Sequence, residues 1–169
     1  MTFEIVPASM TLLDDYEAYI SECYESGLGH YETDVKDPEK SLRLVIDAAT
    51  GKNLPDGWVP YETFYAVQEG RILGAIRLRL GDNDYIRTHI GHIGYETRPS
   101  ERGNGVAKAL LNFVVTKKIQ DTVLITCDSD NLASIRVIES VGYRAVGAEE
   151  KPEHANPSKQ KFYVDPSVL

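Results

Sequence analysis

The sequence predicts an α/β (α+β) domain with a mixed central sheet, and three observations support this fold class. Short segments typical of β-strands alternate with longer amphipathic segments typical of helices. The chain has 169 residues, of which 42% are hydrophobic and 26% charged, which suits one ordinary core. A hairpin pattern predicts antiparallel strands early in the chain, and a strand–helix–strand pattern predicts a parallel crossover later. We therefore expect a single domain over residues 1–169.

The first fifty residues predict one strand and two helices. Residues 3–7 have the apolar character of a first strand. Residues 12–26 predict a helix that ends at Gly27, because apolar side chains recur there at helical spacing. A second helix is expected over residues 38–49, since Asp37 supplies a capping carboxylate directly before a proline.

The rest of the chain predicts the main sheet. Two apolar segments flank the turn Glu69-Gly70 and predict a hairpin. A third strand follows and leads into a glycine-containing loop, a helix, a strand, a second helix and further strands. The expected strands cover residues 63–67, 72–80, 88–97, 123–127, a segment reaching 146, and 159–164; the expected helices cover 103–118 and a segment starting at 131.

The segment from Arg98 to Leu111 is the most informative part of the sequence. Gly103 and Gly105 allow the backbone to turn with its N–H groups outward, and a helix begins near Val106. The free N–H groups and dipole of a helix start favour a phosphate or pyrophosphate. A tight turn without a ligand is the alternative. The P-loop pattern and the dinucleotide fingerprint are both excluded, because Val-Ala-Lys follows the second glycine.

A family resemblance rests on two motifs in order. The run Arg102-Gly-Asn-Gly-Val-Ala107 follows a strand, and Asn131-Leu-Ala-Ser134 opens a helix that closes with Gly142-Tyr143. Together they resemble the acyl-coenzyme A loop and the following helix of the GNAT superfamily of N-acetyltransferases. The run from Gly91 to Arg102 further resembles a branch of predicted bacterial acetyltransferases. The resemblance implies helices on both faces of the sheet and central strands that splay around acetyl-CoA.

The resemblance also implies which residues hold the cofactor. The strand ending at Thr97 pairs its main chain with the pantetheine arm, the loop backbone holds the pyrophosphate, and the second helix contacts the same arm. A helix N-cap is the alternative role for Asn131. The implied cofactor-binding residues are Tyr95, Glu96, Thr97, Arg102, Gly103, Asn104, Gly105, Val106, Ala107, Asn131 and Ser134.

Direct acetyl transfer to an amine needs a stabilised oxyanion and a base. A backbone N–H near residues 93–95 would polarise the thioester carbonyl. His92 and Glu96 share a strand face by alternation, and the resemblance places the base closer to His92. We take His92 as the first candidate base and Glu96 as the second. A structural histidine and proton loss through water are the alternatives.

The departing thiolate lacks its usual acid in this sequence. Relatives place a tyrosine in the Asn-x-x-Ser helix, where this chain has Ile138. Tyr143 matches a position that packs in the core of relatives, so the remaining candidates for the general acid are Tyr163 and water. Loops 27–36 and 51–60 are expected to shape the acceptor pocket, whose candidate aromatic walls are Tyr24, Tyr31, Trp58, Tyr61 and Tyr65.

Charge and cysteine content limit the partners. The net charge of −8 argues against nucleic acid and favours cationic small molecules or lysine side chains. The two cysteines, Cys23 and Cys127, are too few for a metal cluster and read as buried thiols, so no metal is expected. Without an apolar run of about eighteen residues or a signal peptide, we expect a cytoplasmic protein with no membrane partner. The sequence leaves the oligomeric state open, with a homodimer as one alternative.

Two functions follow from the sequence. The first is an enzyme that moves an acetyl group from acetyl-CoA to a primary amine of a small molecule, peptide or protein. The second is an acyl-CoA-binding sensor that has lost transfer, which the isoleucine at position 138 makes conceivable. The acceptor is not named by any motif.

Overall fold

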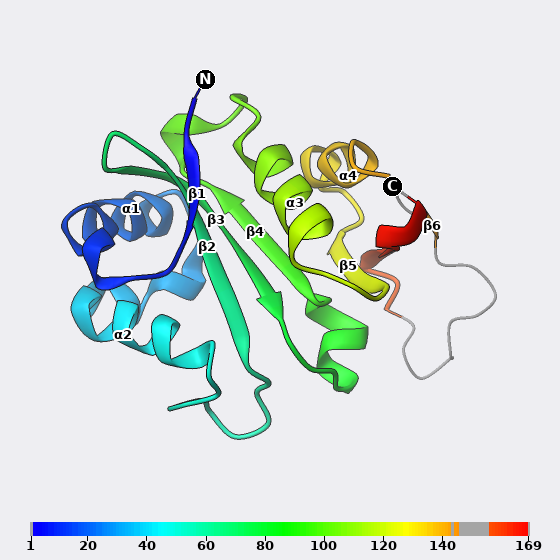
Figure 1. The fold of residues 1–169 in the computed structure, drawn as a ribbon, viewed down its shortest axis with the longest axis horizontal. Coiled ribbons are helices and arrows are strands. Elements are labelled where there is room, and N and C mark those ends of the chain that lie inside the picture. Colours follow the sequence, from blue (N-terminus) through cyan, green and yellow to red (C-terminus); the bar gives the residue numbers. More distant parts are fainter. Residues whose placement is uncertain (1, 143, 146–155, 169) are drawn as a thin grey trace.

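The computed structural model describes residues 2–142, 144–145 and 156–168 (Figure 1). Within them a seven-stranded sheet has the order β1-β2-β3-β4-β5-β7-β6. Neighbouring strands run antiparallel except β4 and β5, which are parallel, so the predicted mixed sheet is confirmed. The strands are β1 (Glu4–Pro7), β2 (Tyr61–Gln68), β3 (Arg71–Arg79), β4 (Ile93–Thr97), β5 (Val123–Asp128), β6 (Arg144–Ala145) and β7 (Lys159–Val164).

Helices cover both faces of this sheet, as expected. Figure 1 shows α1 and α2 on one side and α3 and α4 on the other. Each face has its own buried cluster, because each helix pair turns an apolar stripe toward the strands. Tyrosines dominate the cluster under α1 and α2, where the rings of Tyr16 and Tyr19 meet that of Tyr65 edge to face. The helices are α1 (Leu13–Glu25), α2 (Pro38–Ala48), α3 (Val106–Lys117) and α4 (Leu132–Glu139).

Local signals set most element boundaries as predicted. The carboxylate of Asp37 accepts a hydrogen bond from the Lys40 N–H and caps α2. Glu69 and Gly70 both have positive φ in the turn between β2 and β3. The last predicted strand coincides with β7. Tyr143 lies outside the described residues. Of the strand segment expected to reach residue 146, the described part is β6.

The strand predicted over residues 88–97 is wrong in its first half. Ile86–Ile90 instead form a short π-helical turn, and β4 begins only at Ile93. The chain reverses at Gly91, which has φ +63°, and a Cβ there would lie 2.7 Å from the Leu124 carbonyl oxygen. Only glycine fits this close approach of two backbones. His92 therefore precedes β4 rather than lying on it.

Candidate active site

The central strands separate where the cofactor was expected. One register pair, Ile93 with Ile125, joins the described parts of β4 and β5. Beyond it, a cavity of about 750 Å³ opens between the end of β4, the start of α3 and α4. Ten predicted cofactor residues line this cavity: Tyr95, Glu96, Thr97, Arg102, Gly103, Gly105, Val106, Ala107, Asn131 and Ser134.

Other residues depart from the predicted set. Asn104 is not among the lining residues, and its amide donates to the Glu101 carboxylate at 3.4 Å. His92 does not line the cavity either. Sequence reasoning missed Leu28, Lys108, Ala133, Arg136 and Val137. Lys108 could have been found from its place in the first turn of α3, where a cation would face a bound phosphate; Arg136 carries no such local signal.

The loop before α3 has the geometry of an anion-binding cradle. Gly105 has φ +76° and N-caps the helix, a conformation that favours glycine. Six consecutive backbone N–H groups, from Gly103 to Lys108, donate no hydrogen bond to any residue within the described part of the chain. Nothing lies within 4 Å of a Cβ built on either Gly103 or Gly105. These donors and the positive end of the α3 dipole can bind a pyrophosphate.

The opposite wall of the cavity is tied to β4 by side chains. The Asn131 side-chain oxygen accepts from the Ser134 N–H at 3.1 Å, so Asn131 caps α4 while also lining the cavity. The Tyr95 hydroxyl lies 2.7 Å from Ser134 Oγ. Burial outweighs that hydrogen bond and raises the pKa of Tyr95 to about 12. Tyr95 is thus protonated at neutral pH.

Glu96 lies at the centre of a buried polar network. Its Oε1 accepts hydrogen bonds from the hydroxyls of Tyr19, at 3.0 Å, and Tyr31. Its Oε2 lies 3.3 Å from an Arg77 guanidinium nitrogen. Burial alone disfavours the charge, but Arg77 and the two hydroxyls outweigh burial and lower the pKa of Glu96. Glu96 is therefore an ionised, fully hydrogen-bonded carboxylate and a weak base.

The acceptor nitrogen of the His92 ring is hydrogen-bonded to the main chain of β5. Its Nδ1 accepts a hydrogen bond from the Leu124 N–H at 3.0 Å, and its Nε2 lies 3.6 Å from the Asp82 carboxylate. Burial lowers the pKa of His92, so the neutral ring carries its proton on Nε2. A neutral imidazole has one acceptor nitrogen, and here the Leu124 amide occupies it.

A second cavity of about 490 Å³ lies beside the start of β4, on the face of the sheet covered by α1 and α2. It receives residues from both loops expected to shape an acceptor pocket. Of the predicted aromatic walls, Trp58 and Tyr61 line this cavity, whereas Tyr24 is exposed on α1 and Tyr31 and Tyr65 are buried in the core. The other lining residues are His30, Asp56, Gly57, Val59, Arg79, Asn83, Tyr85, Ile86 and Ile90.

His30 is a histidine that sequence reasoning missed. Its ring centroid lies 4.2 Å from that of Tyr31, whose hydroxyl binds Glu96. Loss of hydration on its packed side lowers the pKa of His30, an effect that Arg77 reinforces and Glu96 opposes. The same loop places Leu28 in the first cavity and His30 in the second. His30 thus lines the second cavity two residues after Leu28, which lines the first, and its lowered pKa leaves it mostly neutral at neutral pH.

The described residues give findings on the cysteines, on metal ligands and on helix length. Cys23 and Cys127 are both buried and unpaired, and burial raises the pKa of Cys23 to about 12. Among the residues that the structure describes, no group of three or more histidine, cysteine, aspartate or glutamate side chains could hold a metal ion. In that same part of the chain, no helix has the length and apolar character needed to span a bilayer.

Several solved structures share the fold at low sequence identity. The microcin C7 self-immunity acetyltransferase MccE, in complex with acetyl-CoA and AMP, is 14% identical with a TM-score of 0.68 over 96% of this chain and 92% of its own. The ribosomal-protein-S5-alanine acetyltransferase from Vibrio fischeri is 12% identical, with a TM-score of 0.68 over 98% and 94%. The Campylobacter jejuni N-acetyltransferase PseH, in complex with acetyl coenzyme A, is 12% identical, with a TM-score of 0.57 over 97% and 99%.

Sequence comparison assigns the family. A search of curated protein sequences found no match. The sequence model of the acetyltransferase (GNAT) family matches residues 16–143, which include most of α1, the cradle and α4. The match covers most of the chain and agrees with the fold and with the two motifs. The chain belongs to the GNAT family of acetyltransferases.

Proposed function

We propose that this chain, acting as a single domain, transfers the acetyl group of acetyl-CoA directly to a primary amine of a small molecule or peptide. The observation that carries the proposal is the row of six N–H groups without partners among the described residues, from Gly103 to Lys108. Five of these six residues, all except Asn104, line the cavity beside the separated strands. Lys108 and Arg136, on the same cavity, add positive charge for the phosphates of the cofactor.

The main chain of β4 supports the position of the thioester. The Arg79 N–H donates to the His92 carbonyl, and the Arg98 N–H donates to the Leu73 carbonyl. The even-numbered residues from 92 to 98 therefore exchange main-chain hydrogen bonds with β3. Alternation along an antiparallel strand directs the N–H and C=O groups of Tyr95 and Thr97 toward β5. These groups are available to the pantetheine arm and to the thioester carbonyl, where an N–H stabilises the developing oxyanion.

His30 is the base that the geometry favours. It has a lowered pKa, no hydrogen bond to any described residue, and a place on the wall of the second cavity, two residues after Leu28 of the first. His92 instead uses its lone pair to accept from the Leu124 amide. The ionised Glu96 is paired with Arg77 and accepts hydrogen bonds from two tyrosines. In this proposal His30 removes the proton from the incoming amine, while His92 and Glu96 position the strand and the loop around it.

Tyr95 is the proposed donor to the departing sulfur. Its hydroxyl is protonated, lines the cofactor cavity and reaches α4 at Ser134. Ile138, at the position where relatives have a tyrosine, is fully buried in the core. A hydroxyl from β4 would then replace one from α4. A hydrogen bond from Tyr95 stabilises the thiolate without requiring full proton transfer.

Two measurements test the function. Acetyl-CoA at about 100 times its dissociation constant should raise the free energy of unfolding by roughly 2.7 kcal/mol, measured by thermal unfolding. Coenzyme A release on an amine panel should then identify an acceptor. No stabilisation at millimolar acetyl-CoA would contradict the cofactor assignment. Stabilisation without release on any amine would support the alternative, an acyl-CoA-binding sensor.

A further inference from the structure

Arg79 is a cation without a carboxylate partner among the residues that the structure describes. Its neighbour on the same face of β3, Arg77, lies 3.3 Å from Glu96. No carboxylate of the described residues lies within 4 Å of the Arg79 guanidinium, which donates only to the Gly91 carbonyl, at 3.3 Å. Burial and the Arg77 charge lower the pKa of Arg79 to about 10, which still leaves it protonated at neutral pH. A half-buried charge without a counterion favours an anionic ligand.

The position of Arg79 places this charge beside the cofactor strand. It lines the second cavity, and its guanidinium lies 3.6 Å from a Cβ built on Gly94. Gly94 belongs to β4 and directly precedes Tyr95, which lines the cofactor cavity. An anion bound by Arg79 would therefore lie close to the edge of β4 where the thioester is expected.

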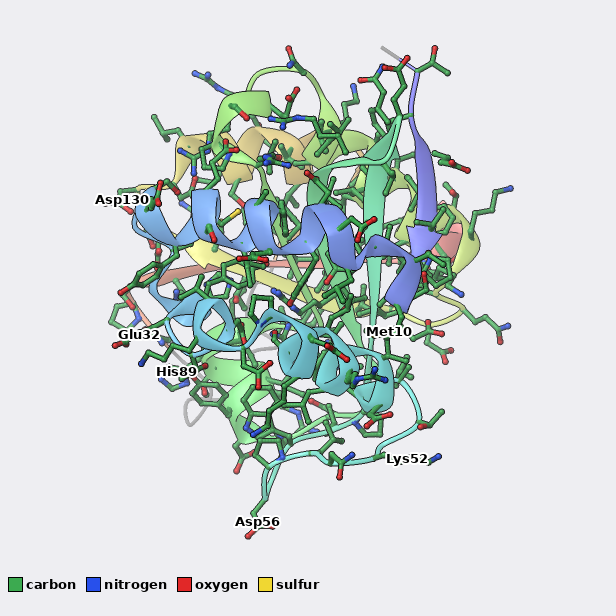
Figure 2. The ribbon with its side chains drawn as sticks, turned by 90° about the vertical axis from the view of Figure 1, so that its left-hand side faces the viewer. Met10, Glu32, Lys52, Asp56, His89 and Asp130 are labelled. Carbon is green, nitrogen blue, oxygen red and sulfur yellow. The ribbon has the colours of Figure 1, made fainter. Side chains whose placement is uncertain are left out.

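The other walls of the second cavity are aromatic. Trp58 and Tyr85 expose 60% and 59% of their surfaces, and the Trp58 ring lies 6.2 Å from that of Tyr61. Large exposed rings around a cavity suit an apolar or aromatic ligand. The acidic residue of the rim does not offset Arg79, since Figure 2 shows Asp56 at the tip of its loop with its side chain pointing away from the protein.

We propose that the second cavity binds the acetyl acceptor, and that this acceptor is an aromatic amine carrying a carboxylate that pairs with Arg79. This inference rests on the proposed function and specifies its substrate class. The class differs from the cationic acceptor that the net charge of −8 favours, because the charge at the site has the opposite sign to the charge of the whole chain.

Binding can be measured without acetyl transfer. Trp58 is the single tryptophan of the chain, so its fluorescence reports on this cavity. The probe is 3-phenylpropanoate, which has the ring and the carboxylate but no amine. We expect saturable quenching or a blue shift in the full-length protein, with a dissociation constant at least about 10-fold weaker in Arg79→Met and partly restored in Arg79→Lys. The control Arg43→Met, on the exposed face of α2, should bind like the parent.

Transfer tests the substrate class with three matched amines. Phenylalanine, its aminophosphonate analogue and phenethylamine differ only in the acidic group. We expect coenzyme A release to be at least about 10-fold more efficient with phenylalanine than with phenethylamine, and this preference to disappear in Arg79→Met. A preference for the phosphonate would contradict the assignment of a carboxylate to the acceptor. Equal use of phenethylamine would contradict the proposal that the acceptor carries an anionic group. Trp58 signals without any release would retain the site but contradict the proposed function, whereas no saturable Trp58 signal with folded protein would overturn the site itself.

Discussion

The hydroxyl of Tyr95 lies 2.7 Å from Oγ of Ser134, which joins β4 to α4 at the wall of the first cavity although 39 residues separate the two side chains. This contact places a protonated hydroxyl on the cavity wall that lacks the tyrosine found in relatives. It also holds α4 against the central strand, so a structural and a catalytic role can be separated by measurement.

Tyr95→Phe should lower kcat by about 10-fold or more while leaving the acetyl-CoA dissociation constant nearly unchanged, because the variant loses the hydroxyl that we propose as the donor to the departing sulfur. The lost hydrogen bond should also lower the free energy of unfolding by about 1 kcal/mol. Steady-state kinetics with the identified acceptor, calorimetric titration and denaturant unfolding check these values. Ser134→Ala removes the same bond but keeps the hydroxyl, so it should reproduce the stability loss with a smaller effect on kcat. A larger kcat loss in Tyr163→Phe would identify Tyr163 as the donor instead.

His30→Ala should lower kcat by about 10² or more, because general-base assistance is commonly worth that much. The pH profile should separate His30 from the other candidates. Since the pKa of His30 is lowered, the neutral base is lost only as pH falls below about 6.5, and activity should fall there in the parent but not in His30→Ala. His92→Ala should instead lower the melting temperature, since it leaves the Leu124 N–H without its acceptor. Near-parent activity of His30→Ala with a large kcat loss in His92→Ala would restore His92 as the base.

Gly105→Val should weaken acetyl-CoA binding by at least about 10-fold. Gly105 has φ +76°, which strains a β-branched residue, and the new side chain would occupy the open space where phosphates approach. Gly70→Val is the matched control, since Gly70 has φ +80° and equally open surroundings but lies in the turn between β2 and β3. Both variants should lose stability. Calorimetric titration should find weaker binding in Gly105→Val alone, and equal affinities would mean that Gly105 serves only the turn.

The ion pair between α1 and the loop after β4 should make stability depend on pH. Glu22 accepts from Arg98 at 2.5 Å and from the Ser100 N–H at 2.7 Å. Burial raises the pKa of Glu22, but these donors outweigh burial and lower it from 4.5 to about 2. The folded state therefore binds fewer protons than the unfolded state between these values. The stabilisation is fully present above pH 4.5 and is lost as pH falls toward 2.

For a side chain 29% exposed, we expect this contribution to be about 1–3 kcal/mol. Urea unfolding at several pH values should show a shallower decline in Glu22→Gln than in the parent. Glu39→Gln, which removes an exposed pair with Arg43, should leave the slope unchanged. An unchanged slope in Glu22→Gln would mean that other carboxylates cause the acid sensitivity.

Local rules determined the elements of this fold and the cofactor loop. Glycine at position 105 is required by a positive φ, and Asp37 before a proline caps a helix wherever the rest of the chain lies. Backbone conformation of this kind depends on a few neighbouring residues. The hairpin and the helices could therefore be predicted from the sequence. The ten predicted residues that line the first cavity were implied by the family resemblance.

The tertiary structure decided which side chains are free to react. The Glu96 carboxylate accepts hydrogen bonds from Tyr19 and Tyr31, which lie 77 and 65 residues away in the chain. The acceptor lone pair of His92 is used by an amide of β5. Arg79 has no carboxylate partner within the described part of the chain, although its sequence context resembles that of Arg77, which pairs with Glu96. Charge, protonation and available lone pairs depend on contacts between distant segments, because burial and hydrogen bonding set them. No periodic pattern in a single sequence records these contacts, so the reactive groups emerged only from the folded chain.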